Sequence, residues 1–179
     1  MISPNNIDPK WYLLYSKPRS EKKAAHELEI RGHQIYLPLQ RTLRQWSDRK
    51  KWVEEPLFKS YLFIYTNLER NYYDILNVPG IVKFVNFEKS PAIVDAREID
   101  LVKRMLGNTS DMEVATNLLE DNSEETNVEV EIIAGPLIGT RGIILNRKGK
   151  TQLLVELTSM HQKILLHVPM ANVRRVSPA

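Results

Sequence analysis

The first 107 residues of the chain alternate between two apolar patterns. Short continuous apolar runs, rich in aromatic and β-branched residues, indicate buried strands. These runs lie at 11–15, 35–39, 61–65 and 81–87. Between them, apolar residues spaced three and four apart predict helices at 20–32, 72–76 and 96–106. The order of these elements predicts an α/β sandwich in which the helices pack on one sheet.

A polar hairpin is predicted between the second and third of these strands, with arms at 43–46 and 51–55. The hairpin carries Trp46 and Trp52, together with five cations: Arg41, Arg44, Arg49, Lys50 and Lys51. This combination suits single-stranded nucleic acid, because cations attract phosphates and aromatic rings stack on unpaired bases. An ordinary solvated face is the alternative interpretation.

The C-terminal part of the chain carries glycines at fixed positions between two β-like apolar runs. Gly135-Pro136 breaks the first run. Gly139 and Gly142 follow, where a positive φ or a close backbone approach would exclude a side chain. This frame, residues 130–144, resembles the KOW motif, the strand–loop–strand core of a small SH3-like barrel. The resemblance implies such a barrel over residues 126–179.

Residues 153–168 satisfy the periods of both a strand and a helix. Apolar residues alternate on either side of a turn at 159–162, as in two strands. The same segment also carries a helical stripe of apolar residues, which consists of Leu153, Leu157, Met160, Ile164 and Val168. We predict strands here, because Thr151, Val155 and Thr158 favour them. The helix is the alternative.

Charge divides the chain into three parts. Residues 1–107 hold 18 Lys and Arg against 13 Asp and Glu, and residues 126–179 hold 7 against 3. Residues 108–125 hold no Lys or Arg and 6 Asp and Glu, and they are rich in Asn, Ser and Thr. We therefore expect two domains, 1–107 and 126–179, joined by an acidic flexible linker at 108–125. The expected fold class is α+β, an N-terminal α/β sandwich followed by a small SH3-like β-barrel.

Composition and motifs exclude several classes of protein. No apolar run approaches the roughly 18 residues of a membrane span, and residues 1–6 do not resemble a signal peptide. The absence of cysteine excludes disulfides and thiolate metal sites and fits a cytoplasmic location. Gly149-Lys150-Thr151 resembles the end of a phosphate-binding loop, but Ile144 stands where the first glycine is required. With no catalytic motif and no metal-spaced histidines, we expect neither an enzyme nor a bound cofactor or metal.

Three segments of the first domain resemble signatures of the NusG N-terminal domain. They are WYLLYSKP at 11–18, EPLFKSYLF at 55–63 and PGIVKFV at 79–85. They occur in the family's order and precede the linker and the KOW frame, so the resemblance covers nearly the whole chain. Residues 11–17 and SPAIV at 90–94 further resemble two specialised groups, the RfaH type and the UpxY antiterminators of capsular-polysaccharide operons.

The resemblance implies an operon-specific transcription elongation and antitermination factor. Such a factor binds RNA polymerase and suppresses pausing or termination, here with polysaccharide biosynthesis operons as the expected targets. We expect a monomer with no membrane partner. The alternative is a general RNA-binding or ribosome-associated KOW protein. It would bind through basic residues of the second domain, which are Arg141, Arg147, Lys148, Lys150, Arg174 and Arg175.

Aromatic residues on neighbouring predicted strands are candidates for the polymerase contact. In an alternating strand Tyr61 and Phe63 share one face, and the helices can cover only the other. A remaining aromatic face is a candidate partner surface. In NusG-like proteins the equivalent patch holds the clamp helices of RNA polymerase. The resemblance implies this role for Tyr15, Phe58, Tyr61, Phe63 and Phe84, with ordinary core positions as the alternative.

Basic residues cluster where the first predicted strand meets the first helix. Lys17, Arg19, Lys22 and Lys23 are close in sequence, and Arg31 follows about two helical turns after Lys23. The resemblance implies that these residues contact the displaced non-template DNA strand.

The second domain has its own candidate contact, in the loop between Gly135 and Gly139. Leu137 and Ile138 lie in this loop, and the resemblance implies that they contact a small-subunit ribosomal protein. In RfaH-type proteins the second domain can instead fold as a helical hairpin over the polymerase patch. The helical stripe at 153–168 would serve that state.

Overall fold

The computed structural model describes residues 8–46, 48–108, 112–114, 128–147 and 150–176. The chain divides into two compact units, Met1–Ala96 and Arg97–Ala179. Each unit has its own sheet. Among the described residues, no helix is long and apolar enough to cross a membrane.

The first unit is built on an antiparallel sheet with the strand order β2-β5-β1-β6, in which β9 also pairs with β1. The strands are β1 (Lys10–Ser16), β2 (Gln34–Tyr36), β5 (Tyr61–Thr66), β6 (Ile81–Phe84) and β9 (Ile93–Val94). The strands predicted at 11–15 and 61–65 are confirmed. The strand predicted at 35–39 ends earlier, because Pro38 has no N–H to donate to a ladder.

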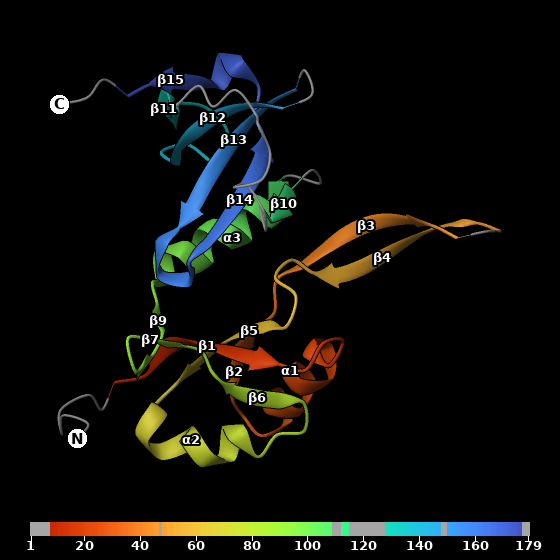
Figure 1. Cartoon of the computed structure of the whole chain (residues 1–179), viewed down its shortest axis with the longest axis vertical. Coiled ribbons are helices and arrows are strands. Elements are labelled where there is room, and N and C mark those ends of the chain that lie inside the picture. Colours follow the sequence, from red (N-terminus) through yellow and green to blue (C-terminus); the bar gives the residue numbers. More distant parts are fainter. Residues whose placement is uncertain (1–7, 47, 109–111, 115–127, 148–149, 177–179) are drawn as a thin grey trace. The chain divides into compact units, whose positions relative to one another are not determined.

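Two helices, α1 (Glu21–Ile30) and α2 (Leu68–Leu76), cover one face of this sheet (Figure 1). Leu28 of α1 and Ile75 of α2 belong to a single buried hydrophobic cluster, which also contains Leu62 and Ile64 of β5. Burying side chains of this size against each other is the main favourable contribution to folding. The predicted packing of helices on one sheet therefore agrees with the structure for the first two helices, whereas the third, predicted at 96–106, belongs to the second unit.

The ends of both helices follow from particular residues. After α1, Gly32 has a φ of +84° and its N–H donates to the Glu29 carbonyl oxygen at 2.9 Å. Before α2, the Asn67 side chain accepts a hydrogen bond from the Arg70 N–H at 3.1 Å. This N-cap begins the helix at residue 68 rather than at the predicted residue 72.

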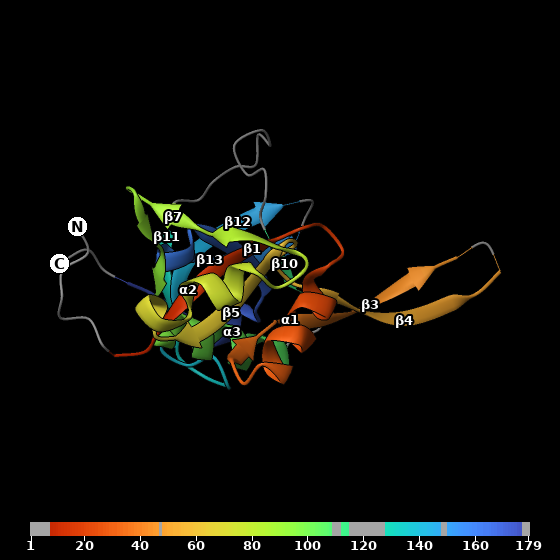
Figure 2. The ribbon, with the colours of Figure 1, turned by 90° about the horizontal axis from the view of Figure 1, so that it is seen from below.

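Two hairpins extend the first unit beyond its sheet. In one, β3 (Leu39–Gln45) pairs with β4 (Lys50–Pro56), and in the other β7 (Asn86–Phe87) pairs with β8 (Ser90–Pro91). The β3–β4 hairpin is the predicted polar hairpin with longer arms. Figures 1 and 2 both show it projecting from the rest of the first unit.

The second unit contains α3 (Ala96–Asn108), which begins at the boundary between the units and confirms the helix predicted at 96–106. Its antiparallel sheet has the order β10-β14-β13-β12-β11-β15. The strands are β10 (Met112–Val114), β11 (Val128–Ile132), β12 (Arg141–Arg147), β13 (Lys150–Leu157), β14 (Gln162–His167) and β15 (Val173–Arg175). Short 3₁₀ helices, η1 (Thr158–Met160) and η2 (Met170–Asn172), follow β13 and β14.

The strand interpretation of residues 153–168 is confirmed, because β13 and β14 pair with each other across this segment. The turn between them is held by Glu98 of α3. The Glu98 carboxylate accepts hydrogen bonds from the Ser159 N–H at 3.1 and 3.2 Å and from the Ser159 hydroxyl at 2.5 Å.

Two glycines of the 130–144 frame occupy positions that disfavour or exclude a side chain, as predicted. Gly139 has a φ of +83°. A Cβ atom on Gly142 would lie 2.3 Å from the Leu154 carbonyl oxygen, so the close approach of β12 to β13 depends on glycine.

The described strands of the second unit run from β10 at one edge to β15 at the other without closing. The SH3-like barrel expected from the sequence is therefore not confirmed. Within the predicted linker, Asn108 ends α3 and Met112–Val114 form β10, which pairs with β14. The rest of residues 108–125 lies outside the described residues, and the flexible linker stays a prediction.

Candidate functional site

The register of β1 and β5 gives the first sheet two different faces. On one face, Leu62 and Ile64 pack with α1 and α2. Because successive side chains alternate along a strand, Tyr61 and Phe63 point to the opposite face. Tyr15 lies directly across from Tyr61 and shares that face. The predicted separation of an aromatic face from a helix-covered face is what the structure has.

Four of the predicted aromatic residues come together on this face and are called the aromatic surface below. The Tyr15 and Tyr61 ring centroids are 5.6 Å apart with the rings at 67°, and those of Phe58 and Phe63 are 6.0 Å apart at 80°. Such edge-to-face pairs stabilise one another beyond simple burial. Phe58 and Phe63 are buried, whereas Tyr15 and Tyr61 are half-buried.

Three further aromatic residues extend this face, and the sequence reasoning missed them. Tyr36 of β2 lies 6.0 Å from Phe63, and Trp11 of β1 lies 5.4 Å from Tyr65, measured between ring centroids. Tyr65 and Trp11 could have been found, because each has the same strand parity as a residue already chosen. Tyr36 depends on the pairing of β2 with β5, which no local pattern reveals.

Phe84 does not join the aromatic surface. It lies across from Leu14 on the helix-covered face. Its ring stacks on Tyr72 of α2 at 5.3 Å and 13°, and its centroid is 6.1 Å from that of Tyr12. Phe84 is thus a core residue, as the alternative interpretation had it.

A buried carboxylate holds the turn that leads into β5. Glu21, in the first turn of α1, accepts a hydrogen bond from the Ser60 N–H at 2.8 Å. Ser60 has a φ of +66°, which is uncommon for a residue with a Cβ atom, and its carbonyl accepts a hydrogen bond from the Ser16 N–H at 2.8 Å. These two bonds fix the backbone between Phe58 and Tyr61. Sequence reasoning placed Glu21 only in the helix.

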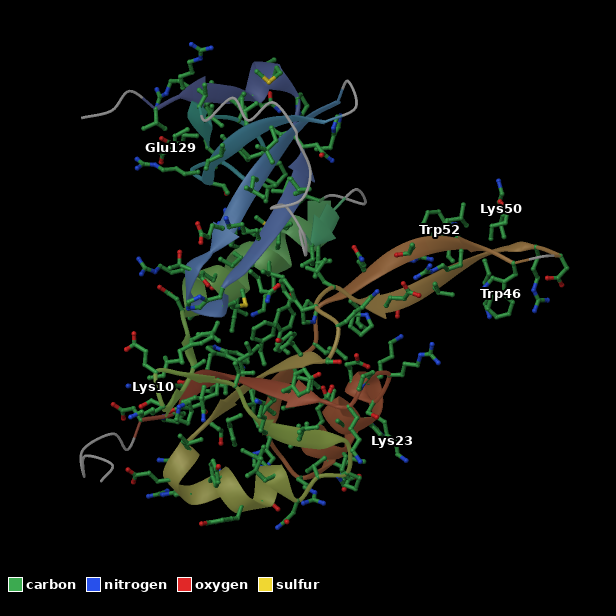
Figure 3. All side chains as sticks on the ribbon, in the orientation of Figure 1. Lys10, Lys23, Trp46, Lys50, Trp52 and Glu129 are labelled. Atoms are coloured by element: carbon green, nitrogen blue, oxygen red, sulfur yellow. The ribbon has the colours of Figure 1, made fainter. Side chains whose placement is uncertain are left out.

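The basic cluster, defined as Lys17, Arg19, Lys22 and Lys23, surrounds the N-terminal end of α1. All four residues are exposed, and Figure 3 labels Lys23 on α1. The Lys22 ammonium donates a hydrogen bond to the Glu54 carbonyl oxygen of β4 at 2.7 Å. The cluster therefore borders the base of the β3–β4 hairpin.

Arg31 lies at the other end of α1 and is engaged in ion pairs. Its guanidinium is 3.3 Å from Glu27 and 3.1 Å from Asp74. The His33 ring, 2.8 Å from the other Asp74 oxygen, and then Arg31 hold the pKa of the Asp74 carboxyl below its ordinary value. Since two carboxylates offset its charge, the structure does not bring Arg31 into the basic cluster.

The two predicted contact residues in the β11–β12 loop of the second unit differ in their exposure. Leu137 is buried, with 7% of its surface exposed, whereas Ile138 is 59% exposed. Ile133 and Met170 are also exposed. The Ile133 N–H donates to the Asn172 carbonyl at 2.8 Å, which brings η2 next to the end of β11. Ile133 was not singled out from the sequence.

Two of the basic residues predicted for RNA binding in the second unit lie near a carboxylate. Arg141 and Arg174 are 3.8 and 3.9 Å from Glu131, which offsets part of their charge. The side chains of Arg147, Lys148 and Lys150 lie outside the described part of the structure.

Among the described residues, no group of three or more His, Asp or Glu side chains lies close enough together to hold a metal ion. The first unit does present two surfaces of different chemistry. The aromatic surface offers apolar contact area of the kind that anchors protein interfaces. The basic cluster offers cations to phosphates.

One protein-family model and two solved structures are similar to this chain. A protein-family model described as "NusG: Transcription termination factor nusG" matches residues 9–103, just over half of the chain. The structure described as "Domain interaction in Thermotoga maritima NusG" is 22% identical in sequence, with 95% of this chain and 98% of that chain covered and a TM-score of 0.58. This likeness shows a shared fold. A chain of the MjSpt4:Spt5 complex is 18% identical in sequence, with 94% of this chain and 97% of that chain covered and a TM-score of 0.31.

Proposed function

The chain belongs to the NusG family of transcription factors, and we propose that it is an operon-specific elongation and antitermination factor. It binds RNA polymerase through its first unit and suppresses pausing or termination. The resemblance of residues 11–17 and 90–94 to the RfaH type and the UpxY group supports this specialised role. The same resemblance points to polysaccharide biosynthesis operons as the targets.

The observation that carries the proposal is the aromatic surface on the sheet face opposite α1 and α2. Tyr15 and Tyr61 are half-buried and already hold each other in one orientation through their ring contact. Rings fixed in this way lose little conformational freedom on binding, and aromatic residues are frequent anchors of interfaces. An apolar helical surface, such as the clamp helices of RNA polymerase, is a partner of matching chemistry.

The buried neighbours of these two tyrosines have a supporting role. Phe58 and Phe63 contact each other beneath the same face, and Glu21 holds the turn between Phe58 and Tyr61. In this account Tyr15 and Tyr61 make the contact with polymerase, and Phe58 and Phe63 keep the surface in shape.

The basic cluster is proposed to contact the displaced non-template DNA strand. Lys17, Arg19, Lys22 and Lys23 belong to the same unit as the aromatic surface, so a chain bound to polymerase carries both. Each cation that neutralises a phosphate releases a condensed counterion, which is favourable at low salt. Arg31 is left out of this contact because Glu27 and Asp74 already offset its charge.

Residues 126–179 of the second unit are proposed to form a KOW domain that binds a small-subunit ribosomal protein. Ile138, Ile133 and Met170 expose apolar surface, which suits a protein partner better than RNA. Leu137 supports the loop from the buried side. Glu131, which offsets Arg141 and Arg174, also disfavours RNA as the main partner.

A transcription assay tests the proposal. The full chain is added to elongation complexes of RNA polymerase from the same organism, on a polysaccharide-operon template with a defined pause and terminator. The fraction of full-length transcript should rise on this template and stay unchanged on an unrelated one. An equal rise on both templates would indicate a general factor of the family. No change on either template, together with no binding to polymerase, would overturn the proposal.

A further inference from the structure

The β3–β4 hairpin has one tryptophan on each of its two faces. Trp52 lies across from Leu43 in the ladder, whereas the Trp46 N–H closes the turn by donating to the Arg49 carbonyl at 2.8 Å. Strand alternation places Trp46 on the face of Arg44, opposite to that of Leu43 and Trp52. Figure 3 shows the two rings on opposite sides of the ribbon.

Both rings are open to solvent on a ribbon that has no core of its own. Trp46 is 51% exposed, Trp52 is 55% exposed and Leu43 is 45% exposed. Large apolar side chains gathered in this way on a thin element are typical of a binding site rather than of stability.

Each ring is accompanied by a guanidinium. The Arg41 guanidinium carbon lies 5.9 Å from the centre of the Trp52 ring, and that of Arg49 lies 5.9 Å from the centre of the Trp46 ring. At this distance a cation is attracted by the ring and is also held ready for a phosphate. About half of the surface of each tryptophan is exposed, which leaves room for a further flat group.

The surrounding charge selects a negative partner. Lys50 and Lys51 are exposed near the turn. Asp48 beside it lies 4.0 Å from the Arg49 guanidinium, in a pair that is open to solvent and therefore weak. Arg44 donates to Glu55 in a two-bond pair, at 3.1 and 2.8 Å, which stiffens the hairpin and lowers the pKa of the Glu55 carboxyl. The part of the ribbon beyond that pair carries more cations than anions.

We propose that the β3–β4 hairpin binds single-stranded nucleic acid, with unpaired bases stacked on Trp46 and Trp52 and phosphates placed beside Arg49, Lys50 and Lys51. Stacking needs a free base face, which a single strand offers and a duplex does not. The hydrogen bond from Lys22 to the Glu54 carbonyl joins the base of the hairpin to the basic cluster, so one strand can follow both. Binding at the hairpin requires no polymerase and is separate from the polymerase contact of the aromatic surface.

Tryptophan fluorescence of the full chain tests this directly. The chain has three tryptophans, so Trp11→Phe leaves only the two on the hairpin. Titration with an oligothymidylate of about 12 nucleotides should quench their emission. In this background Trp46→Ala and Trp52→Ala should each weaken binding roughly 5- to 100-fold, and Trp→Phe at either position should retain most of it. Tyr73→Ala, an exposed aromatic of α2, is the matched control and should bind as before.

Three results would overturn the inference. One is binding, seen by anisotropy of a labelled strand, without any change in tryptophan emission, which would assign the strand to the basic cluster alone. Another is unchanged affinity of Trp46→Ala and Trp52→Ala. The last is equally tight, tryptophan-dependent binding of a duplex of the same length. None of these results bears on polymerase binding by the aromatic surface.

Discussion

The carboxylate of Glu21 accepts a 2.8 Å hydrogen bond from the backbone N–H of Ser60, and both residues are buried. The bond joins the first turn of α1 to the turn before β5. It supports a backbone conformation at Ser60, φ +66°, that residues with a Cβ atom seldom adopt. The aromatic surface therefore depends on a polar contact made beside it.

Glu21→Ala should destabilise the chain by about 1–3 kcal/mol, because it leaves the buried Ser60 N–H without this acceptor. Glu21→Gln keeps a carbonyl oxygen at the same place and should cost less. Urea unfolding measures both. Glu29→Ala, on the exposed side of the same helix, is the control and should change stability by no more than about 0.5 kcal/mol. Equal effects of Glu21→Ala and Glu29→Ala would contradict the role of this bond.

Gly142→Ala should destabilise the second unit by about 1–3 kcal/mol, because the new Cβ would meet the Leu154 backbone and force β12 and β13 apart. The comparison is Gly107→Ala in α3, where a Cβ meets nothing within 4 Å. That change should stabilise the helix by up to about 1 kcal/mol. The midpoint temperature of thermal unfolding should therefore fall in Gly142→Ala and rise in Gly107→Ala. A Gly142→Ala protein that melts like the wild type would contradict the close approach.

Local pattern was enough to predict which residues of β5 share a face, because the side chains of Tyr61 to Ile64 alternate along the strand. It was also enough to place Gly139 and Gly142. The start of α2 was missed although its signal was present, since Asn67 is a preferred N-cap residue.

Pairing register and distant partners could not be predicted in the same way. Phe84 was assigned to the aromatic surface, but β6 meets β1 in a register that places it opposite Leu14. A slip of one residue would move its ring to the other face. Arg31 was assigned to DNA, but its partner Asp74 lies 43 residues away in sequence. Neither the register of β6 with β1 nor the contact of Arg31 with Asp74 can be predicted from a local sequence pattern.

Asp74 should make stability depend on pH at the acidic end. The pKa of its carboxyl is lowered in the folded chain, mainly by the hydrogen bond with His33 and then by Arg31. Its contribution is therefore complete above its ordinary pKa of 3.8 and is lost as the pH falls through the lower folded pKa. Asp74→Asn should destabilise the chain at about pH 5 and have little effect at about pH 2, as measured by urea unfolding. The same loss at both pH values would contradict this assignment.

Lys17 and Lys23 should each contribute to the salt dependence of single-strand binding. Removing one phosphate contact lowers the slope of log affinity against log salt by about 0.7. Lys17→Ala and Lys23→Ala in the full chain should each show this change in titrations with a labelled strand. Arg31→Ala is the matched control and should leave the slope unchanged, because Glu27 and Asp74 offset its charge. If the slope of log affinity against log salt falls equally in all three variants, Arg31 also contacts a phosphate, which contradicts this assignment.

Substitutions at Tyr61 and Phe63 distinguish a residue that contacts polymerase from one that stabilises the aromatic surface. Tyr61→Ala should weaken binding to RNA polymerase by about 2 kcal/mol if the ring is an interface anchor, with a modest effect on folding because the side chain is half-buried. Phe63→Ala should instead lower the free energy of unfolding by about 3–5 kcal/mol, because its ring is buried. Trp52→Ala, an exposed aromatic on the hairpin, should leave binding to nucleic-acid-free polymerase unchanged.

The most direct test of the central claim is the dissociation constant of full-length Tyr61→Ala for RNA polymerase, measured without nucleic acid beside the wild-type chain. The account predicts a loss of affinity of roughly 30-fold in a protein that still unfolds cooperatively near the wild-type midpoint. An unchanged dissociation constant in a folded Tyr61→Ala chain would contradict the claim that the aromatic surface binds polymerase.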